Sequence, residues 1–245
     1  APAQRAWERQ RRFVAGASHE LRAPLAVLRA SAEVALRESD PGDDAQRGLL
    51  RDVLDETDHL SRMVDDLLLL SRLEAGRLSV ECAPVDVTRL AREVGRQFGA
   101  LAARAEVRVR APDANGAAPA SDHVFALGDA GRVRQVLLAL LDNAVRHTPP
   151  GGEVRIETGT DGRHAVLTVA DTGEGIPPEA IGHVFEPFYR VGGTDRGADT
   201  GSGLGLAIAK RLTEAQGGAV TLESAPGRGT KITLTLRAAG AGHRG

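Results

Sequence analysis

Asp171-Thr172-Gly173-Glu174-Gly175-Ile176: this stretch is the most informative part of the sequence for predicting the fold. It follows an apolar strand pattern in which Leu167, Val169 and Asp171 share one face, so a carboxylate ends an apolar row. A carboxylate removed from water needs a hydrogen-bond donor. The two glycines let the backbone turn and let a flat group come close. The stretch therefore predicts either a strand-ending turn or the wall of a site for a base whose exocyclic amine meets Asp171.

A second glycine-rich stretch, Gly201-Ser202-Gly203-Leu204-Gly205-Leu206, opens a helix predicted from about Leu204 to Gln216. Glycines at a helix N-terminus expose backbone N–H groups, and the helix dipole adds to their attraction for an anion. A flexible hinge is the alternative. The segment before it, Pro187 to Thr200, contains three glycines and is predicted to be a mobile lid that closes over a ligand.

A third element is the helix predicted over about Gly131 to Arg146. Asn143, Arg146 and His147 share one face of it because they lie three and four residues apart. An amide oxygen, a guanidinium and an imidazole suit a polyphosphate that carries Mg²⁺, which prefers oxygen ligands and keeps waters and phosphates around it. The alternative is a polar solvent face with Asn143 near the helix end.

The C-terminal part of the chain alternates further helices and strands. Its strands are joined by short turns, such as Gly159 to Arg163 and Pro226-Gly227-Arg228-Gly229, which indicate antiparallel hairpins. Strands segregated from helices predict a two-layer α/β sandwich over residues 85–237, behind a linker at 79–84 and before a flexible tail at 238–245. The expected strands are 106–110, 124–127, 153–158, 165–170, 219–224 and 230–236, and a further helix is expected over 87–103.

Residues 1–78 indicate two long helices, from about Trp7 to Glu38 and from about Ala45 to Ala75, separated by the breaker Ser39 to Asp44. Apolar residues in the second helix alternate three and four apart, which is a heptad seam. A single hairpin cannot bury so wide a stripe, whereas two hairpins paired as a four-helix bundle can. We therefore expect a homodimer, with a helical subdomain of a monomer as the alternative. The seam residues are Leu50, Val53, Leu60, Val64 and Leu67, with Thr57 in the gap.

Taken together, these patterns resemble a known family. In their order and spacing, Asn143 and the two glycine-rich stretches resemble the N, G1 and G2 boxes of the GHKL ATP-binding fold. Phe185-Glu186-Pro187-Phe188-Tyr189-Arg190 resembles the F box of sensor histidine kinases, and Gly227-Arg228-Gly229-Thr230 resembles their final glycine turn. Phe13 to Leu25, which includes Ser18-His19-Glu20-Leu21-Arg22-Ala23-Pro24, is similar to their H box. The resemblance covers nearly the whole chain and implies an α+β protein, in which a helical hairpin forms a dimeric four-helix bundle and an ATP-binding α/β sandwich follows.

The resemblance also implies an activity, that of a protein-histidine kinase in a two-component system. His19, a largely neutral imidazole near pH 7, would accept the γ-phosphoryl group of ATP. Glu20 would orient or deprotonate it, and an aspartate of a response-regulator receiver domain would then take the group. Asn143 would hold Mg²⁺, Asp171 would read adenine, and Arg190 would stabilise the transferred phosphoryl. The other residues implied in the nucleotide pocket are Arg146, His147, Gly173, Gly175, Ile176, Gly201, Gly203, Leu204, Gly205 and Thr230.

Three residues depart from the pattern of the family. Ala139 stands one turn before Asn143, where relatives often have a second Asn, so we expect a working site with weaker Mg²⁺ binding. Ala23 stands one turn after His19, where many relatives carry Thr or Asn, and we expect a poor phosphatase toward the phosphorylated partner. Gly16 replaces an acidic or amide residue, with little expected effect.

Composition excludes several classes. A formal net charge of −2 provides no basic field for nucleic acid. The single cysteine, Cys82, rules out an internal disulfide and a cysteine metal cluster. No apolar run is long enough to cross a bilayer. Because the chain starts at Ala1 rather than Met, we expect a fragment: the cytoplasmic portion of a protein anchored in the membrane by an upstream segment.

Two other functions stay open. The first is a different ATPase of the same fold, such as a chaperone or a topoisomerase-like machine, although those lack an H box upstream and carry a further domain after the ATP site. The second is a catalytically silent scaffold, against which Asn143, Asp171 and the glycines argue. Phosphoryl transfer within one subunit and between two subunits are both compatible with the sequence.

Overall fold

The computed structural model describes Leu28, Ala30 and residues 43–76, 78–112, 123–191 and 201–239. The chain divides into two compact units, residues 1–71 and 72–245. Leu28 and Ala30 are helical, as predicted, but the rest of the first predicted helix lies outside the described residues. So do residues 192–200 of the predicted lid and residues 240–245 of the predicted tail. The residues of the H box that lie outside include Gly16, His19, Glu20 and Ala23.

The second predicted helix is confirmed as α2, Asp43–Glu74, which has 32 residues. The chain leaves the helix where Gly76 takes a left-handed φ of 63° and its N–H donates to the carbonyl oxygen of Leu73 (3.1 Å). Met63 and Leu70 are fully buried on it. Within the described part of the chain, neither α2 nor any other helix combines the length and the apolar content needed to cross a membrane. Among the side chains of α2 that the structure describes, the exposed large apolar ones are Leu54, Val64 and Leu68.

A five-stranded sheet is the framework of the second unit, in the order β2-β4-β5-β7-β6. The β4–β5 and β6–β7 pairs are antiparallel hairpins, as the turn sequences predicted, and β5 pairs with β7 in the same sense. Only the short edge strand β2 runs parallel to its neighbour, β4. The strands are β2 (Arg108–Arg110), β4 (Glu153–Thr160), β5 (His164–Asp171), β6 (Ala219–Ser224) and β7 (Thr230–Arg237).

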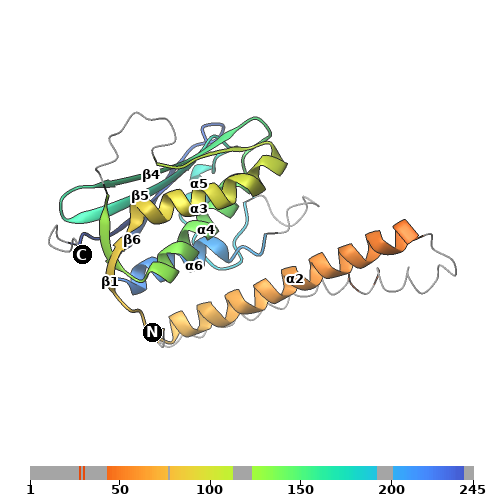
Figure 1. The fold of residues 1–245 in the computed structure, drawn as a ribbon, viewed down its shortest axis with the longest axis horizontal. Helices are drawn as coiled ribbons and strands as arrows, with labels where there is room; N and C mark the ends of the chain where they lie inside the picture. Colours follow the sequence, from red (N-terminus) through yellow and green to blue (C-terminus); the bar gives the residue numbers. More distant parts are fainter. Residues whose placement is uncertain are drawn as a thin grey trace. The chain divides into compact units, whose positions relative to one another are not determined.

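Three helices, α3 (Val87–Ala102), α4 (Ala130–Arg146) and α6 (Gly205–Ala215), cover one face of this sheet (Figure 1). Alternate strand residues point at them and are buried, which is the period-two pattern of a sheet with one covered face. The predicted two-layer sandwich is therefore confirmed. The buried core includes Val154, Ile156, Leu167, Val169, Ile232 and Leu234 from the strands, and Val94, Val136, Leu137, Leu140, Leu141, Ile208 and Leu212 from the helices.

Aspartate side chains set where α3 and α4 begin. Asp86 accepts a hydrogen bond from the N–H of Arg89 (2.8 Å), and Asp129 accepts one from the N–H of Arg132 (3.1 Å). Each side chain satisfies a backbone donor that the first helical turn leaves unpaired. The N–H of Asp129 in turn donates to Oε1 of the buried Gln216, just after α6 (2.9 Å). This bond ties the start of α4 to the end of α6.

Three local expectations need correction. The predicted linker reached Pro84, but β1 (Ala83–Asp86) already pairs there with β3 (Phe125–Gly128) in a separate two-stranded sheet. Strand β2 starts two residues later than predicted because a 3-10 turn follows α3 and Glu106 takes a left-handed φ of 56°. The short helix α5 (Pro178–Ile181) was not predicted, since four residues carry no helical periodicity.

Candidate functional site

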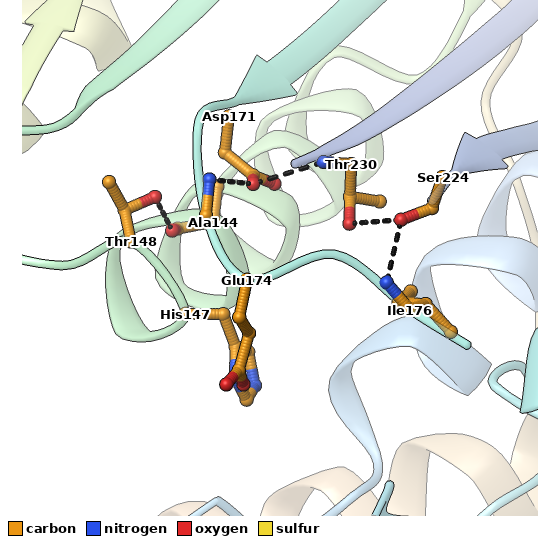
Figure 2. A network of polar contacts seen from close by, with 9 residues as sticks. Ala144, His147, Thr148, Asp171, Glu174, Ile176, Ser224 and Thr230 are labelled. Atoms are coloured by element: carbon orange, nitrogen blue, oxygen red, sulfur yellow. Dashed lines mark hydrogen bonds and ion pairs between the residues drawn. The ribbon is translucent and has the colours of Figure 1, made fainter. Parts of the chain in front are cut away.

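Asp171 ends β5 with its carboxylate fixed by backbone donors. Its Oδ1 accepts hydrogen bonds from the N–H groups of Gly173 (2.8 Å) and Thr230 (3.1 Å). Figure 2 shows Asp171 beside Thr230. Burial raises the pKa of Asp171 above its usual value, against the lowering effect of these two N–H groups and of nearby His147. Among the described residues both hydrogen bonds go to Oδ1, so Oδ2 is the oxygen left to accept a donor from a ligand.

The glycines of the first stretch are required by the protein's own backbone. A Cβ on Gly173 would stand 2.2 Å from the carbonyl oxygen of His147. Gly175 has a φ of 71°, and a Cβ on it would stand 2.0 Å from the carbonyl oxygen of Ala225. Such contacts are far inside van der Waals distance, so only glycine fits at either position. The sequence interpretation assigned this close approach partly to a bound base; that ligand contact stays a prediction.

The final glycine turn closes the site from the other side (Figure 2). The N–H of Ile176 donates to Oγ of Ser224 (2.9 Å), and that hydroxyl donates to the carbonyl oxygen of Gly229 (2.8 Å). Oγ1 of Thr230 lies 2.9 Å from the same Ser224 oxygen. The hydroxyl network holds the Ile176 segment against the β6–β7 hairpin. Sequence reasoning missed Ser224, because nothing in its local pattern distinguishes it from any polar residue at a strand end.

The end of α4 meets the first glycine stretch. The N–H of Glu174 donates to the carbonyl oxygen of His147 (3.3 Å), and Nδ1 of His147 lies 3.2 Å from a carboxylate oxygen of Glu174. Asn143 is half-buried one turn earlier, and its carbonyl oxygen accepts the N–H of His147 (3.1 Å). Arg146 pairs with Asp142, one turn back on the same helix (2.9 Å). The structure thus joins the end of α4 to the Asp171 loop through His147 and Glu174, and the roles predicted for Asn143 and Arg146 stay predictions.

The second glycine stretch packs against α4 at the start of α6. Leu204 is fully buried, and its N–H donates to Oγ of Ser202 (3.3 Å). A Cβ on Gly205 would stand 4.0 Å from Cβ of Ala139, an ordinary contact distance. Gly203 has a left-handed φ of 67°. Ala139 therefore faces the opening of α6, and at this point of α4 it offers no polar atom to a ligand.

The described residues fit a magnesium ion only if phosphates provide most of its ligands. In the ranges that the structure describes, no three His, Cys, Asp or Glu side chains come together in a way that could hold a metal ion. The side chain of Asn143 carries an amide oxygen, and that of Ala139 carries no oxygen. Mg²⁺ commonly takes one or two protein oxygens and fills its shell with phosphates and waters, so this sparse donor set is compatible with a nucleotide-borne ion.

A charged cluster supports the strand next to the site. Glu153 receives a hydrogen bond from Arg155 (3.0 Å) and an ion pair from Arg110 (2.8 Å), while its backbone N–H donates to Oγ1 of Thr172 (3.0 Å). The hydrogen bond from Arg155 lowers the pKa of Glu153 below its usual value of 4.5, burial opposes this, and the charges of the nearby arginines add to the lowering.

We expect Glu153→Gln to lower the melting temperature by a few degrees at neutral pH. A lowered folded-state pKa means that the stabilisation is present above pH 4.5 and is lost as the pH falls through the lower folded-state value. The difference between wild type and variant should therefore shrink on acidification. Circular-dichroism melts from pH 7 downwards measure this. Glu157→Gln, an exposed carboxylate 3.8 Å from the same Arg155, is the control and should change little. A difference that does not depend on pH would contradict the assignment.

Comparison with known proteins follows the same division of the chain. The family model described as histidine kinase-, DNA gyrase B-, and HSP90-like ATPase matches residues 128–240, and that of the His Kinase A (phospho-acceptor) domain matches residues 9–76. The solved mycobacterial sensor histidine kinase MprB is 31% identical, with a TM-score of 0.51, over 64% of this chain and 97% of that chain. This chain belongs to the sensor histidine kinases.

Other sensor histidine kinases are similar over most of the chain. The probable sensor histidine kinase TcrY of Mycobacterium tuberculosis is 42% identical over 219 residues, which is 89% of this chain and 44% of TcrY. The structure of full-length ShkA in complex with AMPPNP is 29% identical, with a TM-score of 0.66, over 94% of this chain and 46% of that chain. The chain spans about half the length of the curated sensor kinases it matches. The match over residues 9–76 covers the predicted H box, which separates this family from other ATPases of the fold.

Proposed function

We propose that this chain is an ATP-dependent protein-histidine kinase that phosphorylates its own His19 and passes the group to an aspartate of a response regulator. The observation that carries the proposal is the carboxylate of Asp171. One of its oxygens is fixed by the N–H groups of Gly173 and Thr230, and the other has no hydrogen-bond donor among the described residues. Asp171 is half-buried, so its second oxygen stands where a donor from a ligand can reach it.

Adenine supplies such a donor through its exocyclic amine. The loops around Asp171 are held by backbone contacts, so the acceptor is already oriented before a ligand arrives, and little ordering has to accompany binding. The similar kinase ShkA, solved with the adenine nucleotide AMPPNP, supports the same ligand class here. His147 and the start of α6, with Gly201, Gly203 and Gly205, would line the pocket.

Asn143 is the residue that would hold Mg²⁺ together with the phosphates. The ion would offset negative charge on the phosphates during transfer. With Ala139 contributing no oxygen, the phosphates carry more of the coordination, and we expect weaker binding of the free ion. Arg190 lies half-buried at the start of the predicted lid, where its guanidinium could stabilise charge on the transferred group.

The acceptor side involves residues outside those described. A ring nitrogen of His19 would form a P–N bond to the γ-phosphorus as the P–O bond to ADP breaks and ADP leaves. Glu20 would orient the ring or take its proton. In the second step the phosphoryl group moves from His19 to an aspartate carboxylate of the regulator, which regenerates the free imidazole.

The apolar surface of α2 supports the proposed homodimer. Leu54 is 63% exposed and Leu68 is 52% exposed in the single chain, although both are large apolar residues. Pairing of two hairpins into a four-helix bundle would cover them. Placement on the cytoplasmic side of a membrane, below an upstream anchor, follows from the resemblance and stays a prediction.

Incubation with γ-labelled ATP and Mg²⁺ tests the proposed activity. We expect protein-bound label that is labile in acid and stable in base, as a phosphohistidine is. Its loss to background in His19→Gln would assign the acceptor, and transfer to added receiver domains would test the second step. His164→Gln is the control, because His164 lies at the far end of β5 from Asp171 and should keep full labelling. Release of phosphate without protein label would favour a plain ATPase, and label retained by His19→Gln would overturn the acceptor site.

A further inference from the structure

The chain has only two lysines. One of them lies over an aromatic ring of the turn that contains the F box, which is called the F-box turn below. The ammonium nitrogen of Lys210, in the middle of α6, lies 5.3 Å from the ring centroid of Phe185. This is a cation–π distance. Both side chains are partly exposed, so the contact lies at the surface and not in the core of the sheet. It joins α6 to a segment that is separate from it in sequence.

The F-box turn, residues 183–190, makes several hydrogen bonds and ring contacts within itself. The N–H of Glu186 donates to the carbonyl oxygen of His183 (2.7 Å), and the N–H of Tyr189 donates to that of Glu186 (3.2 Å). The His183 ring lies 3.0 Å from a Glu186 carboxylate oxygen and 5.5 Å, centroid to centroid, from the ring of Tyr189. A displacement of Phe185 would therefore move the whole turn, including the backbone that leads to Arg190.

The turn ends where it meets the second glycine stretch. The contact between Phe188 and Gly203 at this point is called the closure below, and its backbone is strained. Phe188 has a left-handed φ of 64°, which is unfavourable for an aromatic residue. Its N–H donates to the carbonyl oxygen of Gly203 (2.9 Å), and a Cβ on Gly203 would stand 2.9 Å from Cα of Phe188. A strained residue persists only where its surroundings hold it. The two chain segments on either side of residues 192–200 thus meet at Phe188 and Gly203.

We propose that Lys210 is a positioning residue, which holds the Phe185 turn on α6 and thereby keeps the Phe188–Gly203 closure formed. By keeping the closure formed, Lys210 also determines the position of Arg190 at the end of the turn. The part of this proposal that concerns phosphoryl transfer rests on the proposed function; the closure itself does not. Gly203 then has a structural role in the closure, whether or not its N–H also meets a phosphate.

The neighbouring Arg211 provides a contrast on the same helix. Its guanidinium pairs with Glu214 at 3.1 Å, whereas the ammonium of Lys210 lies 4.0 Å from Glu214. Removal of the Lys210 charge therefore leaves Glu214 with its shorter partner. Arg211→Met deletes a charge and an ion pair from α6 without touching Phe185, which makes it the matched control for Lys210→Met.

Amide hydrogen exchange of Phe188 in the nucleotide-free chain, followed by NMR, measures the closure directly. A partly exposed cation–π contact contributes enough to favour the closed state by roughly two- to fivefold, so Lys210→Met should speed exchange of this amide by about that factor. Lys210→Arg keeps a cation over the ring and should restore the wild-type rate, and Arg211→Met should leave it unchanged. Equal rates in Lys210→Met and Arg211→Met would overturn the proposal.

A double-mutant cycle identifies the partner of Lys210. Phe185→Leu removes the ring face, so it should speed exchange like Lys210→Met, and the double variant should be no faster than either single variant. Additive effects would overturn the Lys210–Phe185 contact. In the labelling assay at saturating ATP, Lys210→Met should lower the autophosphorylation rate by a similar factor, with Lys210→Arg again restoring it. If wild type takes up no label while the exchange rates follow this pattern, the kinase function fails and the closure stands.

Discussion

Replacement of Asp171 by Asn should lower ATP affinity by about two orders of magnitude while the domain stays folded. The two backbone N–H groups that now bind Oδ1 will hold the amide oxygen of the Asn in the same place. Its NH₂ group then takes the place of Oδ2. The exocyclic amine of adenine would face a second hydrogen-bond donor instead of an acceptor, so the hydrogen bond is lost. Burial, which raises the pKa of Asp171, costs stability in the ionised form, so the neutral Asn should leave the melting temperature unchanged or higher.

Titration calorimetry with ATP and a thermal melt on the same samples measure both effects. Asp161→Asn is a matched control, because Asp161 also accepts two backbone N–H groups, from Arg163 (2.9 Å) and His164 (2.7 Å). It lies in the β4–β5 turn, at the opposite end of β5. There the His164 side chain and these backbone donors lower the pKa of Asp161 to about 2. Unchanged ATP affinity in Asp171→Asn would contradict the role of Asp171 as the acceptor for adenine, on which the proposed function rests.

Gly229→Ala should be the most destabilising single substitution near the site. Gly229 has a φ of 74°, and a Cβ on it would stand 1.9 Å from the carbonyl oxygen of Asp171. The obstructing atom belongs to the backbone, so no rotamer relieves the overlap. We expect a loss of more than about 3 kcal/mol, since a left-handed alanine alone costs roughly 1–2 kcal/mol. Movement of Thr230 would also take its N–H away from Asp171 and abolish nucleotide binding.

Gly227 provides the comparison within the same turn. Its φ is 72°, but a Cβ on it would meet nothing within 4 Å. Gly227→Ala should therefore carry only the backbone cost of about 1–2 kcal/mol, or a fall in melting temperature of roughly 2–8 °C, and should still bind ATP. Urea unfolding of the two variants separates the backbone cost of a left-handed alanine from the cost of the Cβ overlap at Gly229. Equal stability of Gly227→Ala and Gly229→Ala would show that the overlap relaxes without a penalty.

Much of the fold could be predicted because it depends on local periodicity. The α4 helix and the β4–β5 and β6–β7 hairpins follow directly from apolar spacing and turn residues. What the sequence could not reveal depends on pairing between distant segments. Strand β1 has no signal of its own, and Pro84 argues against a strand there until β3 is known to be its partner in the described part of the chain. The parallel pairing of β2 with β4 depends likewise on the path of the intervening chain.

The same division holds for the site. Sequence alone identified the family, because the order and spacing of Asn143, Asp171 and the glycines are typical of it, and it predicted that these residues carry the chemistry. Only the tertiary structure decided why two of these glycines are there: Gly173 and Gly175 make room for the carbonyl oxygens of other loops. It also decided that Ser224 and Lys210 belong with them. The physical reason is that hydrogen bonds, close backbone approach and cation–π contact depend on distance in space, which no local pattern along the chain encodes.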